Sequence, residues 1–81
     1  MKANIYVSPK KTVLDPQGAT IRAALVALDF GGVKSVRQGK YFQIQLSSDL
    51  TPAQAREQVE RIAKEVLTNP VIEDFTFQIE E

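Results

Sequence analysis

The secondary structure of this chain is clearest in the segment TPAQAREQVERIAKEV, residues 51–66. Thr51 followed three residues later by Gln54 matches a capping box, and Pro52 fits the first helical position because its φ is fixed and its missing N–H needs no partner there. The apolar residues of the segment form one stripe at helical spacing: Ala55, Val59, Ile62, Ala63 and Val66. The spacing predicts a helix that ends at Asn69 and Pro70, since Asn tolerates a left-handed cap and Pro cannot continue a helix.

Segments with strand-like alternation lie on both sides of this helix. The alternating apolar residues are Phe42, Ile44 and Leu46 before the helix and Phe75, Phe77 and Ile79 after it. A period of two is typical of a strand with one buried face. Residues 33–38 are also β-like, and Gly39 in the short link to residues 41–46 indicates a hairpin, because Gly tolerates the positive φ of tight turns.

The N-terminal third repeats the same order of elements. Ala3, Ile5 and Val7 alternate with polar residues up to Pro9, which predicts a first strand. Asp15 can cap a helix whose first position is Pro16, and an apolar stripe follows at Ile21, Ala24, Leu25 and Leu28. The predicted helix covers roughly residues 17–30, and Gly31 and Gly32 are expected to supply the left-handed backbone that ends it.

The predicted order βαββαβ in 81 residues leaves room for one domain, spanning residues 1–81. With short connections, the order is typical of an α+β fold of the ferredoxin-like type. We therefore expect a four-stranded antiparallel sheet with both helices on one face.

The composition excludes most kinds of catalytic site. The chain has no Cys and no His, so it lacks a thiolate nucleophile, the usual general base and the commonest metal ligand. Neither GxxxxGK[ST] nor GxGxxG is present, which leaves no nucleotide-binding loop. No apolar run is long enough for a membrane span, and residues 1–6 do not resemble a secretory signal. The expectation is a cytoplasmic protein that binds no metal or cofactor and no membrane.

The side of the sheet away from the helices is predicted to carry neutral polar and aromatic residues, which a partner covers at lower desolvation cost than charges. These residues, here called the open face, are Asn4, Tyr6, Tyr41, Gln43, Gln45, Thr76 and Gln78. A solvated face is the competing interpretation. Because a core of about 80 residues supplies only a few kcal/mol, we expect a homo-oligomer built through this face.

The ten basic and ten acidic side chains are unevenly distributed. Residues 1–40 hold seven basic and two acidic side chains, and residues 41–81 hold three and eight. Lys10 and Lys11 in a loop, with Arg37 and Lys40 at the hairpin, could form an anion site, although residue chemistry alone favours solvated loop and turn side chains. The zero net charge argues against nucleic acid as a partner, so an RNA-binding domain is a weak alternative, alongside a small-molecule-binding regulatory module of the same fold.

Four short motifs carry a family resemblance: VSPK at residues 7–10, VLDPQG at 13–18, VRQGK at 36–40 and LTNPVIED at 67–74. In this order and spacing, the chain resembles the PurS subunits of phosphoribosylformylglycinamidine (FGAM) synthase, an enzyme of purine biosynthesis. One departure is Asp29 before Phe30, where the family pattern has a small residue, usually Gly.

The resemblance implies a non-catalytic subunit that forms dimers, with tetramers left open, and bridges a glutaminase subunit (PurQ) and an ATP-dependent synthetase subunit (PurL). It also implies help with ammonia transfer, while ATP and Mg belong to the synthetase. The residues it marks for partner docking are Pro9, Lys10, Asp15, Pro16, Gly18, Arg37, Gly39, Lys40, Asn69, Pro70 and Val71. Lys10, Arg37 and Lys40 rank first because no turn or capping role explains them.

Overall fold

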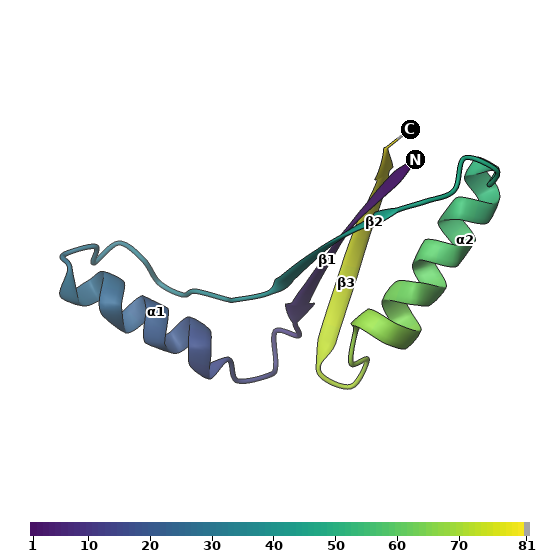
Figure 1. Ribbon diagram of the computed structural model, residues 1–81. Helices are drawn as coiled ribbons and strands as arrows, with labels where there is room; N and C mark the ends of the chain where they lie inside the picture. The colour runs from purple at the N-terminus through teal and green to yellow at the C-terminus, as the bar shows by residue number, and fades with distance from the viewer. Residues whose placement is uncertain (81) are drawn as a thin grey trace.

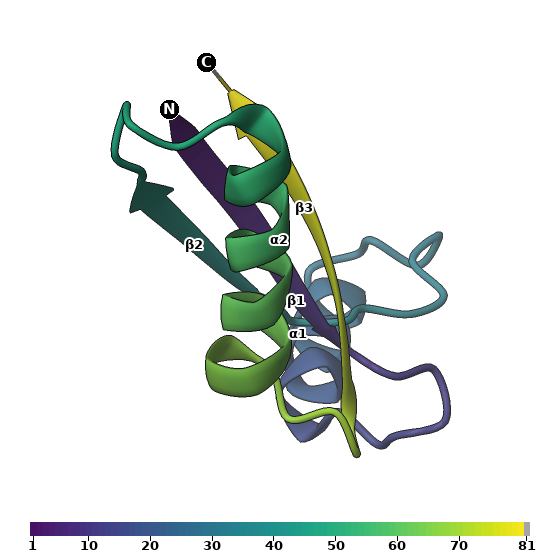
Figure 2. The same ribbon diagram turned by 90° about the vertical axis from the view of Figure 1, so that its right-hand side faces the viewer.

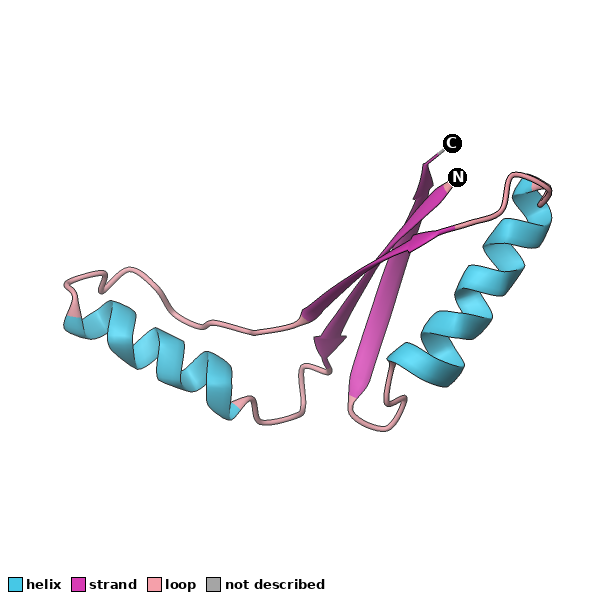
Figure 3. Ribbon diagram, viewed as in Figure 1, coloured by secondary structure: helices cyan, strands magenta, loops and turns pink. Residues whose placement is uncertain are grey.

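The computed structural model of the chain describes residues 1–80 and forms a sheet with two helices (Figures 1 and 3). The elements are β1 (Lys2–Pro9), α1 (Pro16–Ala27), β2 (Lys40–Gln45), α2 (Pro52–Ile62), a π-helical turn η1 (Ala63–Leu67) and β3 (Glu73–Glu80). The three strands are antiparallel in the order β2-β1-β3. The predicted α+β class is confirmed.

The core lies between the central strand β1 and α2. Ala3, Ile5 and Val7 of β1 point to the helix and are almost completely buried, together with Val59 and Ala63. Pairing places Phe42 of β2 and Phe77 of β3 on either side of Ile5, so both edge strands extend the apolar surface. The helix lies along β3 and not along β2 (Figure 2), which leaves the β2 half of this apolar surface less covered.

The first helix does not pack on the sheet. Residues 10–39, here called the arm, project away from it and carry α1 at a distance from α2 (Figure 1). The molecule measures 51 × 25 × 14 Å with a radius of gyration of 16.2 Å, against about 12 Å for a compact chain of this length. The prediction that both helices cover one face is therefore wrong for α1, and the ferredoxin-like arrangement is not confirmed.

The fourth strand is absent from the part of the chain described. Residues 33–38 form an extended connection from the tip of the arm back to β2 (Figure 3), so the predicted hairpin is wrong. A strand requires a neighbour for its N–H and C=O groups. This segment returns alongside α1, away from the sheet, and has no strand beside it.

Local capping signals are confirmed at both helix starts. The Asp15 side chain accepts a hydrogen bond from Gly18 N, and Pro16 occupies the first turn of α1. Thr51 and Gln54 form the reciprocal capping box of α2, with Pro52 in its first turn. Such signals act within a few residues, so they hold wherever the helix is placed.

The ends of both helices differ from the prediction. Asp29, with φ of 76°, takes the left-handed position at the end of α1, and Phe30 N donates to Leu25 O as in a Schellman motif. The predicted role of Gly31 and Gly32 is therefore wrong, since neither has a positive φ. In η1 the wider π-helical turn rotates Val66 out of the apolar stripe, and this residue is 74% exposed.

Candidate interaction surfaces

Arg37 lies where the arm joins the sheet and binds three backbone carbonyl groups. Its Nη1 donates to Val13 O at 2.7 Å and to Lys10 O at 3.2 Å, and its Nη2 donates to Lys11 O at 2.6 Å. Hydrogen bonds from a charged donor are stronger than neutral ones. The expectation that Arg37 has no structural role is therefore wrong: it ties the connection entering the arm to the connection leaving it.

Asp15 joins the same two connections. Its Oδ2 accepts from Gln38 N at 2.8 Å, while its Oδ1 accepts from Gly18 N at 3.1 Å. These hydrogen bonds, that from Gln38 first, hold the pKa of the Asp15 carboxyl below its usual value. A side chain at position 18 would meet Val36 O, because a β-carbon there would lie 2.2 Å from that atom. Residues 10–18 and 36–39, joined in this way, are here called the neck.

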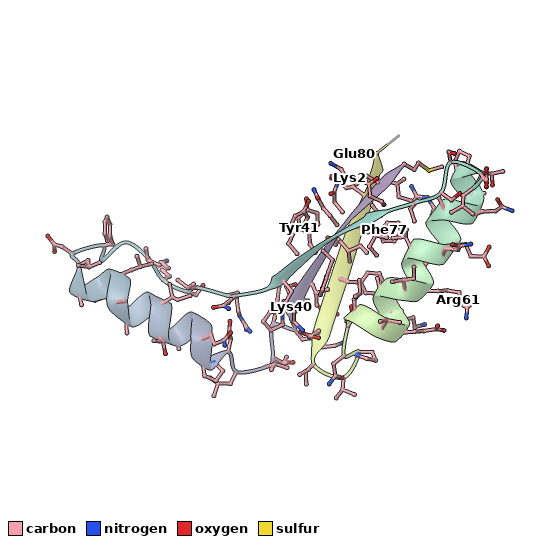
Figure 4. All side chains as sticks on the ribbon, viewed as in Figure 1. Lys2, Lys40, Tyr41, Arg61, Phe77 and Glu80 are labelled. Atoms are coloured by element: carbon pink, nitrogen blue, oxygen red, sulfur yellow. The ribbon has the colours of Figure 1, made fainter. Side chains whose placement is uncertain are left out.

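The two lysines predicted for docking form ion pairs with β3. Lys10 Nζ lies 3.5 Å from Asp74 Oδ1, and Lys40 Nζ lies 3.4 Å from Glu73 Oε2. A third pair, Lys2 with Glu80 at 3.2 Å, closes the other end of the sheet (Figure 4). The basic first half and acidic second half of the chain are thus partly paired with each other, which leaves less positive charge for a partner.

The turn before β3 places three predicted docking residues, Asn69, Pro70 and Val71, on the surface. Asn69 organises the turn: its N–H donates to Glu73 Oε1 at 2.8 Å, and its Oδ1 accepts from Val71 N at 3.1 Å. Val71 itself is 79% exposed. Pro70 and Lys10 line an adjacent groove of about 440 Å³ together with Thr68, whose buried hydroxyl has no hydrogen-bond partner within residues 1–80.

The remaining predicted docking residues have local backbone roles. Pro9 ends β1, and Pro16 starts α1. Gly39 passes close to β1, because a β-carbon there would lie 2.4 Å from Val7 O. Asp15, Gly18, Arg37 and Gly39 thus meet in or beside the neck, whereas Asn69, Pro70 and Val71 lie at the turn before β3.

The residues predicted for the open face do lie together on the side of the sheet away from α2. Strand pairing aligns Asn4 with Gln43 and Gln78, and Tyr6 with Tyr41 and Thr76; Gln45 is opposite Lys2. The rings of Tyr6 and Tyr41 stack with centroids 5.1 Å apart. Gln43 Nε2 donates to Tyr41 Oη, which in turn donates to Asn4 Oδ1. These contacts order the middle of the face, which is neutral, while Lys2 and Glu80 form an ion pair at one end of it (Figure 4).

Sequence reasoning missed a second surface, the apolar side of the arm. Its exposed members are Ile21, Leu28 and Phe30, of which Leu28 is 69% and Phe30 57% exposed. On the sheet, the half-buried residues Phe42 and Ile44 of β2 lie on the side that α2 leaves partly uncovered. The stripe at Ile21, Ala24, Leu25 and Leu28 was the available signal, but its spacing does not reveal whether the cover comes from the same chain.

Within residues 1–80 the structure brings together no group of three acidic side chains that could hold a metal ion. No helix in the described part is both long and apolar enough to cross a membrane. The polar clusters at the neck and on the open face bind the chain's own backbone and side chains. These features describe a small α+β chain whose exposed surfaces are suited to contacts with other proteins.

The comparisons with known proteins identify the family. The model of the family described as PurS: phosphoribosylformylglycinamidine (FGAM) synthase matches residues 2–81, and the chain belongs to this family. It is 36% identical over 80 residues to the FGAM synthase subunit PurS of Bacillus subtilis, covering 99% of this chain and 93% of that protein. Members are named as subunits of a synthase, and the small subunit is not itself named as catalytic.

Solved structures agree with this assignment. PurS of Methanocaldococcus jannaschii, described as one of the subunits of formylglycinamide ribonucleotide amidotransferase in the purine biosynthetic pathway, superposes with a TM-score of 0.85 at 38% identity, covering 99% of this chain and 95% of that one. A superposition of this extent includes the arm. A chain of the Thermotoga maritima PurLQS structure superposes with a TM-score of 0.75 at 28% identity, over 95% of this chain and 93% of that chain.

Proposed function

We propose that this chain is the non-catalytic small subunit of an FGAM synthase, bridging the glutaminase (PurQ) and the ATP-dependent synthetase (PurL). The observation that carries the proposal is the full-length match to PurS, together with the likeness to a chain of the PurLQS structure. Glutamine would be hydrolysed on the glutaminase, and the ammonia used on the synthetase to convert formylglycinamide ribonucleotide to FGAM. ATP and Mg would bind the synthetase and not this chain, and the compartment would be the cytoplasm.

The surface around the turn before β3 is our proposed site for a larger subunit. Val71 is exposed, and Lys10 and Pro70 line the neighbouring groove. A partner side chain entering the groove would bury apolar surface. Arg37, Asp15 and Gly39 contribute to docking through the shape of the neck.

The second proposed partner is another copy of this chain. Each copy has a helix whose apolar side no other element covers and an apolar sheet half that α2 covers only in part (Figure 1). Two copies related by a two-fold axis would bury both apolar surfaces, because the arm of each copy would lie on the β2 half of the other copy's sheet. The open face is a further proposed self-contact, by which dimers would pair into a tetramer.

Two measurements test these assignments separately. Sedimentation velocity at micromolar concentration should give a dimer or tetramer, and a monomer throughout would refute the self-contacts. Size-exclusion chromatography of a mixture with a PurL-type and a PurQ-type subunit should give one complex containing all three chains. Elution of the small chain apart from both enzymes, in the presence of their substrates, would refute the bridging role.

A further inference from the structure

The direction of the arm depends on the neck. Figure 1 shows α1 standing clear of the sheet, and its only buried residue is Gly18, in the first turn. No apolar packing against α2 or the strands therefore holds the helix at its angle. The contacts that join the arm to the rest of the molecule lie at its two ends: Lys10 N donates to Ile72 O and Lys10 Nζ pairs with Asp74, while Gly39 passes close to Val7 O. The side-chain hydrogen bonds of Arg37 and Asp15 join these two ends to each other.

These contacts cross-link the two connections of the arm. Arg37, on the returning connection, binds the carbonyl oxygens of Lys10, Lys11 and Val13 on the outgoing one. Asp15, on the outgoing connection, accepts from Gln38 N on the returning one at 2.8 Å. The partners are 23 to 27 residues apart in sequence, so each bond fixes one connection against the other.

Close backbone packing at two glycines strengthens the cross-link. At Gly18 a β-carbon would lie 2.2 Å from Val36 O, which shows how closely α1 approaches the returning connection. At Gly39 a β-carbon would lie 2.4 Å from Val7 O, which shows how closely that connection approaches β1. Both connections of the arm are thus held against each other and against the end of the central strand.

We infer that Arg37 and Asp15 are positioning residues that fix the direction of the arm for a second copy of this chain. The inference rests on the dimer proposed above. An arm that pivots freely spends only a fraction of its time in the orientation that a partner accepts, and the apparent dissociation constant rises as that fraction falls. In the symmetric dimer each copy contributes one arm. A tenfold fall in the fraction of time that each arm holds the binding orientation therefore raises the dimer Kd by about 100-fold.

The test combines an arm-direction measurement with a dimer Kd. The chain has no Cys, so Ala23→Cys on α1 and Glu57→Cys on α2, both exposed, accept two spin labels. Labelled chain is diluted with unlabelled chain, so that double electron–electron resonance reports the distance within one copy. Sedimentation equilibrium then gives the dimer Kd of the unlabelled variants.

Arg37→Ala is expected to broaden the distance distribution and raise the dimer Kd at least tenfold. Arg37→Lys keeps the charge but loses the fork of donors, and should fall between Arg37→Ala and wild type. Lys34→Ala is the matched control, because Lys34 is an exposed cation on the same connection with no hydrogen bond or ion pair within residues 1–80; it should leave both quantities unchanged.

Asp15→Asn is a second variant, in which the side chain keeps nearly the same size. It should also broaden the distribution of spin-label distances. Circular dichroism of each variant checks that the sheet and α2, to which the side chains of Arg37 and Asp15 form no hydrogen bond within residues 1–80, remain folded. A narrow distribution and a wild-type Kd in Arg37→Ala would overturn the inference, as would a broad distribution with an unchanged Kd. A wild-type chain that is monomeric would refute the proposed dimer. The distance distributions of wild type and Arg37→Ala, compared with each other, would still report whether Arg37 holds the arm.

Discussion

The hydroxyl group of Tyr41 donates a hydrogen bond of 2.7 Å to Oδ1 of Asn4, a residue that is only 5% exposed although it lies on the open face. The neighbouring Tyr6 stacks on Tyr41 at 5.1 Å, but its own hydroxyl has no hydrogen bond within residues 1–80. The two tyrosines therefore stack on each other and differ in the hydrogen bonds of their hydroxyl groups, since that of Tyr41 also accepts one from Gln43.

Tyr41→Phe should lower the free energy of unfolding by about 1–2 kcal/mol, because it leaves a buried amide oxygen of Asn4 without its donor. Tyr6→Phe, the matched control, should change it by less than about 0.5 kcal/mol. Urea denaturation at one fixed protein concentration measures both, since self-association would otherwise shift the midpoint. Equal effects of the two substitutions would contradict the role given to this hydrogen bond.

Asp29→Gly should stabilise the chain by about 0.5–1 kcal/mol. Asp29 has a φ of 76°, which strains an L-residue and not a glycine. Asp29→Ala is the control of opposite sign, because Ala lacks the short polar side chain that makes the left-handed region tolerable. Thermal unfolding should therefore rank Gly above Asp and Asp above Ala, and a midpoint for Asp29→Gly below wild type would contradict this reading of the helix end.

Protonation of Asp15 should loosen the neck. Hydrogen bonds from the backbone of Gln38 and Gly18 lower the pKa of this carboxyl below its ordinary value of 3.8. A native-state pKa below the unfolded one means that the contribution to stability is complete above about pH 4 and is lost as the pH falls through the native value. An NMR titration of the Asp15 carboxyl should give a midpoint below 3.8, and Asp15→Asn should make α1 unfolding less dependent on pH in the acid range. A midpoint at or above 3.8 would contradict the hydrogen bonding described.

Val71→Asp should weaken binding to the larger subunits without affecting folding. Val71 is 79% exposed at the turn before β3, so a carboxylate there stays hydrated in the free chain and is desolvated only if a partner covers it. We expect a loss of at least tenfold in affinity for the synthetase–glutaminase mixture, while Val71→Ile retains wild-type affinity. Biolayer interferometry with immobilised small subunit measures both, and equal binding of the two variants would exclude Val71 from the interface.

Most local features were predicted correctly, although the left-handed position that ends α1 falls on Asp29 and not on Gly31 or Gly32. The caps at Asp15 and Thr51 and the alternation in β1, β2 and β3 depend on neighbours within one or two turns, and all were predicted correctly. The grouping of Asn4, Tyr6 and Tyr41 on one face follows from the same alternation. Periodicity determines which side of an element is apolar.

Features that depend on distant parts of the chain were not predicted. The apolar stripe of α1 has the same spacing whether the helix covers its own sheet or another copy's, so the position of the arm could not be read from Ile21 or Leu28. The role of Arg37 depends on carbonyl groups 24 to 27 residues away, which no local pattern reveals. Residues 33–38 have strand-like composition, but a strand forms only beside another strand.

The bridging role is tested most directly by the rate of FGAM formation by a PurL-type synthetase and a PurQ-type glutaminase, with and without this chain. With glutamine as the nitrogen source, we predict that product formation requires the chain, since the two enzymes would otherwise not be held together. With an ammonium salt in place of glutamine, the synthetase alone should form product at the same rate in both mixtures. A full glutamine-dependent rate in the absence of the chain would contradict the bridging function.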